Sequence, residues 1–465
     1  MTRRLSTFVR PLVAALVLAL LSAGLPAAAQ DSAALEERIG KLEKQLAETR
    51  AELAAARGGP SDARLKELEH ALEVLTKEIE ALKLGEAAAP EAPAARIALG
   101  PAASRVYGAK KGVSIGGYGE FLYQGFGSSR EDGSPSDETA TVDLLRAVLY
   151  FGYKFDERFV FNSEIEVEHA VSASDKEGEV EVEFATLDYL HSKAFNARAG
   201  LVLIPMGLTN LLHEPPTFSG ARRPDVEQVI IPTTWRELGF GAWGDLGDLS
   251  YQAYLVNGLN ASGYDAEEGI REGRQEGSEA LAKNWAVTGR LDYHGVPGLV
   301  VGASIFSGGA GQGLTAPDGQ TPTARTTVWD LHADYRVRGF ELRGLYARTA
   351  ISDAAAIDLA NGLEGDESVG SRQYGWYLQG GFDLFSLRPG SRMSLVPFLR
   401  YERWDTQDEV PAGYARNPEY DVKQLTLGIG FKPIENVVLK VDWQQQKNEA
   451  RTGVDRWNIS LGYLF

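Results

Sequence analysis

Two neighbouring segments of the sequence carry a carboxylate at every second position. Glutamates alternate with Ile165 and Val167 in the first segment, and with Val180, Val182 and Phe184 in the second. The glutamates are Glu164, Glu166, Glu168, Glu179, Glu181 and Glu183. A period of two places alternate side chains on opposite faces of a β-strand. If the two strands form a hairpin, these six carboxylates line one wall and attract cations, while the apolar side chains face the other way.

Other segments with the same period carry charges of both signs on one face. The clearest pairs are Arg290 with Asp292, Asp330 with His332, and Arg400 with Glu402. We expect such pairs to neutralise one another along a wet interior, where exposed ion pairs contribute little to stability. A charged interior that holds water predicts a wide channel rather than a small, solid barrel.

The sequence offers no evident set of residues for catalysis or metal binding. It contains no cysteine, which excludes disulfides, thiolate metal sites and cysteine nucleophiles. Its six histidines are scattered without the spacing typical of metal ligands, and no strand pairs a serine with a histidine convincingly. We therefore expect no enzyme, no metal site and no cofactor. The formal net charge of -17 argues against nucleic acid as a partner, because phosphate binding needs the opposite sign.

Residues 1–29 have the form of a secretory signal peptide. Arg3, Arg4 and Arg10 precede an apolar run over 12–21, and small residues end at Ala29. The apolar run is shorter than the roughly 20 residues that a membrane-spanning helix needs. We expect cleavage after Ala29 and export of the rest of the chain.

Residues 30–84 have the pattern of a coiled coil. Apolar positions recur at alternating intervals of four and three, with a break over 58–60 that divides the pattern into two short helices. Self-association of these helices is one interpretation, and packing of an amphipathic helix on the body of its own chain is the other. Residues 85–112 are rich in alanine, proline and glycine and predict an extended linker.

From residue 113 to residue 465 the period changes to two. We count about sixteen alternating stretches, which predict an all-β transmembrane barrel of antiparallel strands preceded by the α-helical coiled coil. After residue 30 no apolar run is long enough for a membrane-spanning helix, so a membrane form must be a barrel. Short turns such as 338–339 are expected on the periplasmic side, and long polar connections such as 258–283 outside the cell.

The last strand shows the alternation most clearly. Its apolar face consists of Trp457, Ile459, Leu461, Tyr463 and Phe465. A terminal phenylalanine on such a strand resembles the signal by which outer-membrane barrels are handed to the barrel assembly machinery. We therefore expect Phe465 to act in assembly, and outer-membrane lipid to cover the apolar face.

The connection over 204–237 is long and unusual for a solvated loop. It contains the apolar residues Phe218, Val229, Ile230 and Ile231, which suggest that it packs against something. Its charged residues include His213, Glu214, Arg222, Arg223, Asp225, Glu227 and Arg236.

Four segments resemble the phosphate-selective porins of the O and P type, which are trimeric outer-membrane barrels of sixteen strands. They are GGYGEF at 116–121, RAVLYFGYKF at 146–155, IPMGL at 204–208 and the terminal Phe465. The resemblance covers most of residues 113–465. It implies that the third external loop folds into the barrel and narrows it, which would place the charged residues of 204–237 at the constriction.

The expected function is passive or weakly selective diffusion of small hydrophilic solutes or ions through a homotrimer in the outer membrane of a Gram-negative bacterium. The coiled coil would lie in the periplasm. An alternative is a structural tether between the outer membrane and the cell wall. A surface that acts as an adhesin or receptor is a third interpretation.

Overall fold

The computed structural model describes residues 41, 44, 45, 47, 48, 99–109, 111–173, 178–388 and 391–465. The expected signal peptide over 1–29 lies outside the described residues, and so does most of the expected coiled coil over 30–84. The five described residues of the coil are helical, and Lys44 lies 3.9 Å from Glu48 in an ion pair one turn apart. Association of these helices stays a prediction.

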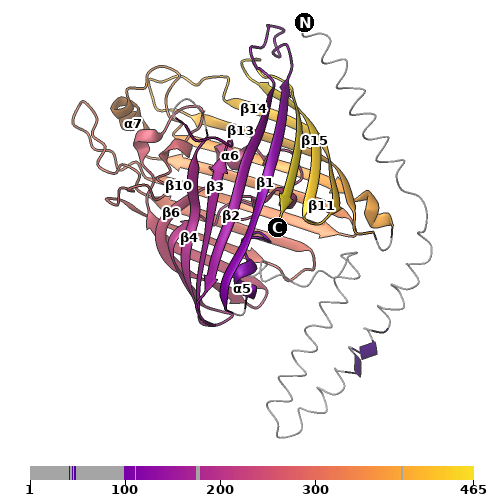
Figure 1. Ribbon diagram of the computed structural model, residues 1–465. Helices are drawn as coiled ribbons and strands as arrows, with labels where there is room; N and C mark the ends of the chain where they lie inside the picture. Colours follow the sequence, from indigo (N-terminus) through magenta and orange to yellow (C-terminus); the bar gives the residue numbers. More distant parts are fainter. Residues whose placement is uncertain are drawn as a thin grey trace. The chain divides into compact units, whose positions relative to one another are not determined.

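Antiparallel strands close into a barrel in which each strand pairs with its neighbours in the chain and β1 pairs with β16. In Figure 1, β1 accordingly lies beside the yellow C-terminal strands. The first eight strands are β1 (Gly112–Phe126), β2 (Thr141–Lys154), β3 (Phe159–Glu168), β4 (Val180–Leu190), β5 (Asn196–Leu203), β6 (Arg236–Leu246), β7 (Leu249–Asn257) and β8 (Trp285–Tyr293). The others are β9 (Leu299–Gly308), β10 (Thr326–Val337), β11 (Phe340–Ile351), β12 (Arg372–Phe382), β13 (Ser394–Glu409), β14 (Asp421–Ile434), β15 (Val437–Asn448) and β16 (Arg456–Leu464). The predicted all-β barrel of sixteen strands is confirmed.

Short and long connections lie at opposite ends of the barrel. The turn between β10 and β11 has φ angles of 48° at Arg338 and 84° at Gly339, the positive pair that a tight two-residue hairpin turn requires. The long connections, among them 127–140, 204–235 and 258–284, join the other ends of the strands. We call these two ends of the barrel the short-turn end and the long-loop end.

The outer face of the barrel is apolar. On β16, Trp457, Ile459 and Leu461 are 36% to 39% exposed, whereas the alternating Asn458 and Ser460 are buried inside. Most other strands also present large apolar side chains outward at this period, such as Leu238 and Phe240 on β6 and Leu331 on β10, which suits contact with hydrocarbon. No helix among the described residues has the length and apolarity to cross a membrane.

The C-terminal residue closes the barrel against β1. The Phe465 backbone N–H donates to the Gly117 carbonyl at 2.9 Å, and the Gly117 N–H donates to the Phe465 carbonyl at 3.0 Å. A Cβ at Gly117 would lie 2.8 Å from the Phe465 ring and 2.3 Å from the Val148 carbonyl oxygen. Only glycine therefore fits beneath the terminal ring.

The interior is filled far more than the sequence predicted. A large apolar cluster occupies it, in which Ile204, Ile230 and Trp235 from the connection 204–235 pack on the inner faces of β7 to β13. The expected ion pairs form, for example between Arg400 and Glu402 at 2.7 Å, but both side chains are fully buried. The expectation of an interior lined by wet ion pairs is therefore wrong at these positions, because the connection 204–235 packs against them through Gly220 and Val226.

Part of the predicted extended linker over 85–112 is folded instead. Residues 99–109 include the short helix α5 (Arg105–Gly108), and Leu99, Ala102 and Val106 are buried against the inside of the barrel. The Asn162 side chain on β3 donates to the Ala103 carbonyl at 2.8 Å. Small side chains let this segment approach the wall closely, a fit that composition alone does not reveal.

Candidate functional site

The connection 204–235, which we call loop 3, crosses the interior of the barrel. It contains the 3-10 turn η2 (Pro215–Thr217) and the helix α6 (Val226–Val229), which Figure 1 shows behind the front strands. The Ala221 N–H donates to Asp442 on β15 at 2.6 Å, and Asp225 accepts from Arg456 on β16 at 2.9 Å. The loop that leaves β5 therefore reaches the strands that close the barrel on its far side.

Two glutamates of loop 3 anchor the loop through buried hydrogen bonds. Glu227 is fully buried and accepts hydrogen bonds from the backbone N–H groups of Leu208 and Thr209 at 2.6 and 2.7 Å, and from the Tyr377 hydroxyl on β12 at 2.6 Å. Glu214 accepts from the backbone N–H groups of Ala102 and Ala103. These carboxylates fix loop 3 to itself, to the wall and to the N-terminal segment.

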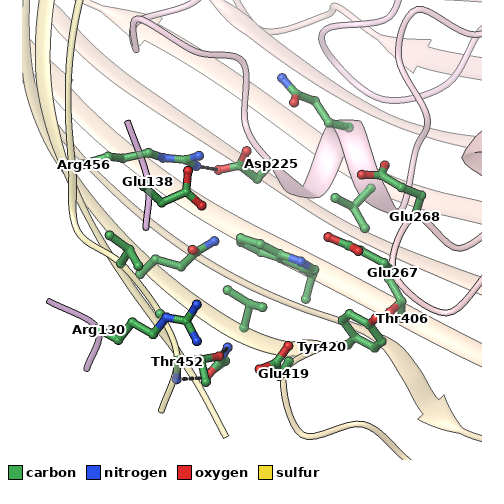
Figure 2. A pocket seen from close by; sticks show the side chains of 18 of the residues that line it. Arg130, Glu138, Asp225, Glu267, Glu268, Thr406, Glu419, Tyr420, Thr452 and Arg456 are labelled. Atoms are coloured by element: carbon green, nitrogen blue, oxygen red, sulfur yellow. Dashed lines mark hydrogen bonds and ion pairs between the residues drawn. The ribbon is translucent and has the colours of Figure 1, made fainter. Parts of the chain in front are cut away.

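A first cavity of about 790 Å³ opens among the long loops. Its lining includes the basic residues Arg130, Arg222, Arg271 and Arg456, and the acidic residues Asp137, Glu138, Asp225, Glu267, Glu268 and Glu419. In Figure 2, Arg130 and Arg456 lie toward one side of the cavity and Glu267 and Glu268 toward the other. Charges of both signs nevertheless alternate around the cavity, since Asp225 pairs with Arg456 at 2.9 Å and Arg271 lies 3.8 Å from Glu268.

A second cavity of about 730 Å³ adjoins the first, since Arg222, Gln228 and Arg271 line both. Its other charged lining residues are Glu120, Asp143, Arg146, Glu168 and Arg223. It lies between loop 3 and the inner faces of β1, β2 and β3. Arginines of loop 3 thus face carboxylates of the wall across the space.

A third, small cavity of about 30 Å³ lies toward the short-turn end. Phe218 lines both this cavity and the second one. The Phe218 ring is nearly buried, and the Lys440 ammonium nitrogen lies 3.5 Å from its centroid, in the geometry of a cation–π contact. Phe218 therefore lies where the second and third cavities meet.

The charged residues predicted in loop 3 fall into two groups. Arg222, Arg223 and Asp225 line the cavities. The others line none of these three cavities in the described part of the chain; they are His213, Glu214, Glu227 and Arg236. The position of a residue on a loop does not show whether its side chain lines a cavity or anchors the loop by buried contacts.

The acidic wall is only partly exposed to the cavities. Glu168 lines the second cavity, and Glu164, Glu166 and Glu183 are buried. Glu181 is half-buried and pairs with Arg236, and Glu179 is exposed ahead of β4. The expectation that Phe184 faces outward is wrong, because its ring is buried inside and stacks on Tyr150 at 6.1 Å.

A β-bulge explains the reversal at Phe184. Glu164 pairs with Phe184 but its neighbour Ile165 pairs with Val182, so Glu183 is an extra residue on β4. One extra residue shifts the alternation by one position and turns the following side chain to the other face. Glu183 and Phe184 are consequently both buried inside the barrel.

Sequence reasoning missed most residues of the first cavity. Arg130, Arg271, Glu267 and Glu419 come from separate long loops, which meet only in the folded barrel. Residues 112–116, which fit the GxSxG pattern of serine hydrolases, were also missed from the sequence. These residues lie in β1, whereas that motif requires a strand, a sharp turn and a helix.

Two carboxyl groups in the connection 258–284, Asp265 and Glu268, have shifted pKa values. Burial raises the pKa of Glu268 above its ordinary value, and Arg271, 3.8 Å away, opposes the shift. Burial also raises the pKa of Asp265. Glu268, which lines the first cavity, therefore loses its charge at a higher pH than a free carboxylate would.

No family model matches the chain. Among solved structures, OmpF of Salmonella typhi in complex with daunomycin aligns with a TM-score of 0.51 over 77% of this chain and 98% of that one, at 12% identity. The outer membrane channel DcaP of Acinetobacter baumannii aligns with a TM-score of 0.49 over 76% of this chain and 97% of that one, at 13% identity. At such identities the likeness to OmpF shows the barrel fold alone.

A curated relative supplies the evidence of descent. An uncharacterized protein of Aquifex aeolicus (strain VF5) is 39% identical over 384 residues, which make up 81% of this chain and 85% of the relative. The chain therefore belongs to the same family as this Aquifex aeolicus protein.

Proposed function

We propose that this protein is an outer-membrane porin through which small hydrophilic, charged solutes diffuse. The observation that carries the proposal is the succession of three cavities inside the barrel, each sharing lining residues with the next, from the long loops toward the short-turn end. The apolar outer face supports a membrane location, because a water-soluble protein rarely exposes so much apolar surface.

Selectivity in this proposal comes from charges that face one another across the second cavity. Arg222, Arg223 and Arg271 face Glu120 and Glu168. Rings and opposed patches of charge favour solutes whose own charges fit between them. Because both signs are present, the channel is weakly selective, and the proposed relationship to the phosphate-selective porins does not extend to phosphate selectivity.

The proposal includes assembly. The signal-peptide pattern over 1–29 supports export, the heptad pattern over 30–84 supports a periplasmic coiled coil, and the terminal Phe465 supports delivery by the barrel assembly machinery. A homotrimer is the assembly that the resemblance to sixteen-stranded porins favours.

The test is single-channel recording of the purified full-length protein in a planar bilayer under a salt gradient. We expect stepwise openings in groups of three and a reversal potential that indicates weak selectivity. A correctly folded barrel that passes no current would contradict the proposal. A variant without residues 31–84 should still conduct, whereas loss of envelope integrity without loss of conductance in that variant would favour a tether.

A further inference from the structure

Four carboxylates and one imidazole gather behind loop 3, away from the three cavities. Glu164, Glu183 and His213 each offer an atom within 4.8 Å of the others, and Glu166, Glu181 and Glu183 do the same. The two groups share Glu183. All are buried except Glu181, which is half-buried. His213 comes from loop 3, and the glutamates come from β3 and β4.

The hydrogen bonding of His213 defines which nitrogen faces the carboxylates. Its Nδ1 lies 2.9 Å from the Asn210 carbonyl oxygen, which can only accept, so Nδ1 carries the proton of the neutral ring. The lone pair on Nε2 then points at Glu164, 3.2 Å from both oxygens, and at Glu183, 3.3 Å away. A lone pair that faces two carboxylates is repelled unless a positive species lies between them.

A backbone carbonyl that accepts the remote N–H is also the usual support for a metal-binding histidine. It fixes the tautomer and turns the other nitrogen toward the metal. His213 has this support from a carbonyl only three residues before it in loop 3.

A second and independent feature is the set of buried polar atoms that lack a hydrogen-bond partner. Neither carboxylate oxygen of Glu166 has one among the described residues, and Glu166 is fully buried. Oε2 of Glu183 and the buried Tyr118 hydroxyl also lack one, and Tyr118 lies within electrostatic reach of Glu164, Glu166 and Glu183. Several unsatisfied groups therefore converge on one place.

The neighbouring arginines do not supply enough positive charge. The Arg146 Nε is 3.4 Å from Glu166, but the same guanidinium also serves Glu120 and Glu168, at 3.6 and 3.5 Å. Arg236 is shared between Glu181 and Glu276. Arg223 lies within electrostatic reach of Glu183 while it donates to the His213 carbonyl at 3.5 Å. A buried group of carboxylates with so few counter-charges is costly unless another positive species is bound.

We propose that Glu164, Glu183 and His213 bind a divalent first-row transition metal ion, Mn²⁺ or Zn²⁺, with Glu166 and Glu181 grouped around Glu183 beside it. Two carboxylates with one imidazole suit these ions, whereas Mg²⁺ and Ca²⁺ prefer oxygen ligands alone. The ion joins the first half of loop 3 to β3 and β4. Its role is to hold loop 3 against the wall, and it is independent of whether the barrel conducts.

The test uses the full-length protein in detergent, stripped with EDTA and then titrated with Mn²⁺ or with Zn²⁺. Free Mn²⁺ is followed by electron paramagnetic resonance, and heat release by calorimetry. We expect one ion per chain and a rise in Tm on binding. Glu183→Gln, which keeps an oxygen to accept from Thr234, should weaken Mn²⁺ binding by a factor of about 10 to 100.

The matched control is Glu402→Gln, which changes a fully buried wall carboxylate outside both groups and should leave Mn²⁺ affinity unchanged. If Glu183→Gln does not fold, His213→Gln serves as the second variant, with the same expected loss. Absence of Mn²⁺ and Zn²⁺ binding to the unsubstituted protein up to about 1 mM overturns the proposal. If neither ion binds, and Glu183→Gln without metal has a higher Tm than the unsubstituted protein, then bound protons rather than a metal ion neutralise the carboxylates.

Discussion

Phe218 lies where the second and third cavities meet, and its ring packs against Lys440. An aromatic side chain at this position restricts passage by its volume, and the ammonium group beneath it holds the ring in place. In the proposed channel, we therefore expect the apolar side chain of Phe218 to limit the conductance. The charged residues around it determine which ions arrive.

Phe218→Ala should raise the single-channel conductance, because it joins the second cavity to the third. Removing a nearly buried ring should also cost about 3 kcal/mol of unfolding free energy. Single-channel recording and thermal unfolding in detergent measure the two effects. Phe240→Ala, which removes an exposed ring from the outer face, is the control and should leave conductance unchanged. An unaltered conductance in Phe218→Ala would place the restriction elsewhere.

The double change Arg222→Ser and Arg223→Ser should make the channel prefer cations, because Glu120 and Glu168 then act without opposing charges from loop 3. The reversal potential should move toward the limit of about 59 mV that complete cation selectivity gives for a tenfold gradient. Arg372→Ser is the control, since that side chain is half exposed and lines none of the three cavities. A shift toward anions would be evidence against this placement of the arginines.

Acidification should shift the selectivity of the proposed channel toward anions. Burial raises the pKa of Glu268, so its charge is lost at a higher pH than that of an ordinary glutamate, whose pKa is 4.5. The reversal potential measured from pH 7 to pH 4 should therefore move toward anion preference. In Glu268→Gln the shift should be smaller and displaced to lower pH. Identical titrations of the two proteins would exclude Glu268 as a contributor.

At the scale of elements, loop 3 is the part of the chain that distinguishes this barrel from a hollow one. Its apolar residues Ile204, Ile230 and Trp235 are fully buried, so the loop behaves as an internal core rather than as a surface connection. Glu227 connects the start of the loop to its second half and to β12. The position of Arg222 and Arg223 depends on this internal support.

Glu227→Gln should loosen loop 3. The amide oxygen can keep the N–H groups of Leu208 and Thr209, but the amide nitrogen can only donate, so the bond to the Tyr377 hydroxyl must reverse and all three lose the assistance of the negative charge. We expect a cost of about 1 to 3 kcal/mol in unfolding free energy and noisier single-channel currents. Glu409→Gln, at an exposed side chain on β13, should do neither. Equal Tm values for the two variants would contradict the role assigned to Glu227.

At the scale of the whole molecule, β1 and β16 close the barrel, and the terminal residue extends their pairing to Gly117. Phe465→Ser keeps the backbone hydrogen bonds to Gly117 but removes the ring that covers it. We expect less folded barrel in the outer membrane, measured as the heat-modifiable fraction on gels. Phe340→Ser removes an equally exposed outer aromatic side chain at the short-turn end and is the control. Equal yields of both variants would show that the position of Phe465 is not special.

The sequence alone was sufficient to predict the barrel and its sixteen strands. The alternation of apolar and polar residues, as in Trp457 to Phe465, is a local property that a two-residue period records directly. The same pattern identified Glu164 and Glu183 as interior residues, and the apolar residues of loop 3 indicated that it packs. Each of these conclusions depends on neighbours within one strand or one loop.

Only the tertiary structure decided how the interior is filled. The bulge at Glu183, the burial of residues 99–109 and the position of His213 beside Glu164 each involve residues that are far apart in the chain or a change of register. A period of two predicts which face of the strand a side chain occupies, but it does not predict which group packs against that side chain inside the barrel. Whether a lumen side chain meets water, loop 3 or another carboxylate is set by packing across the barrel, and packing is not a local property of the sequence.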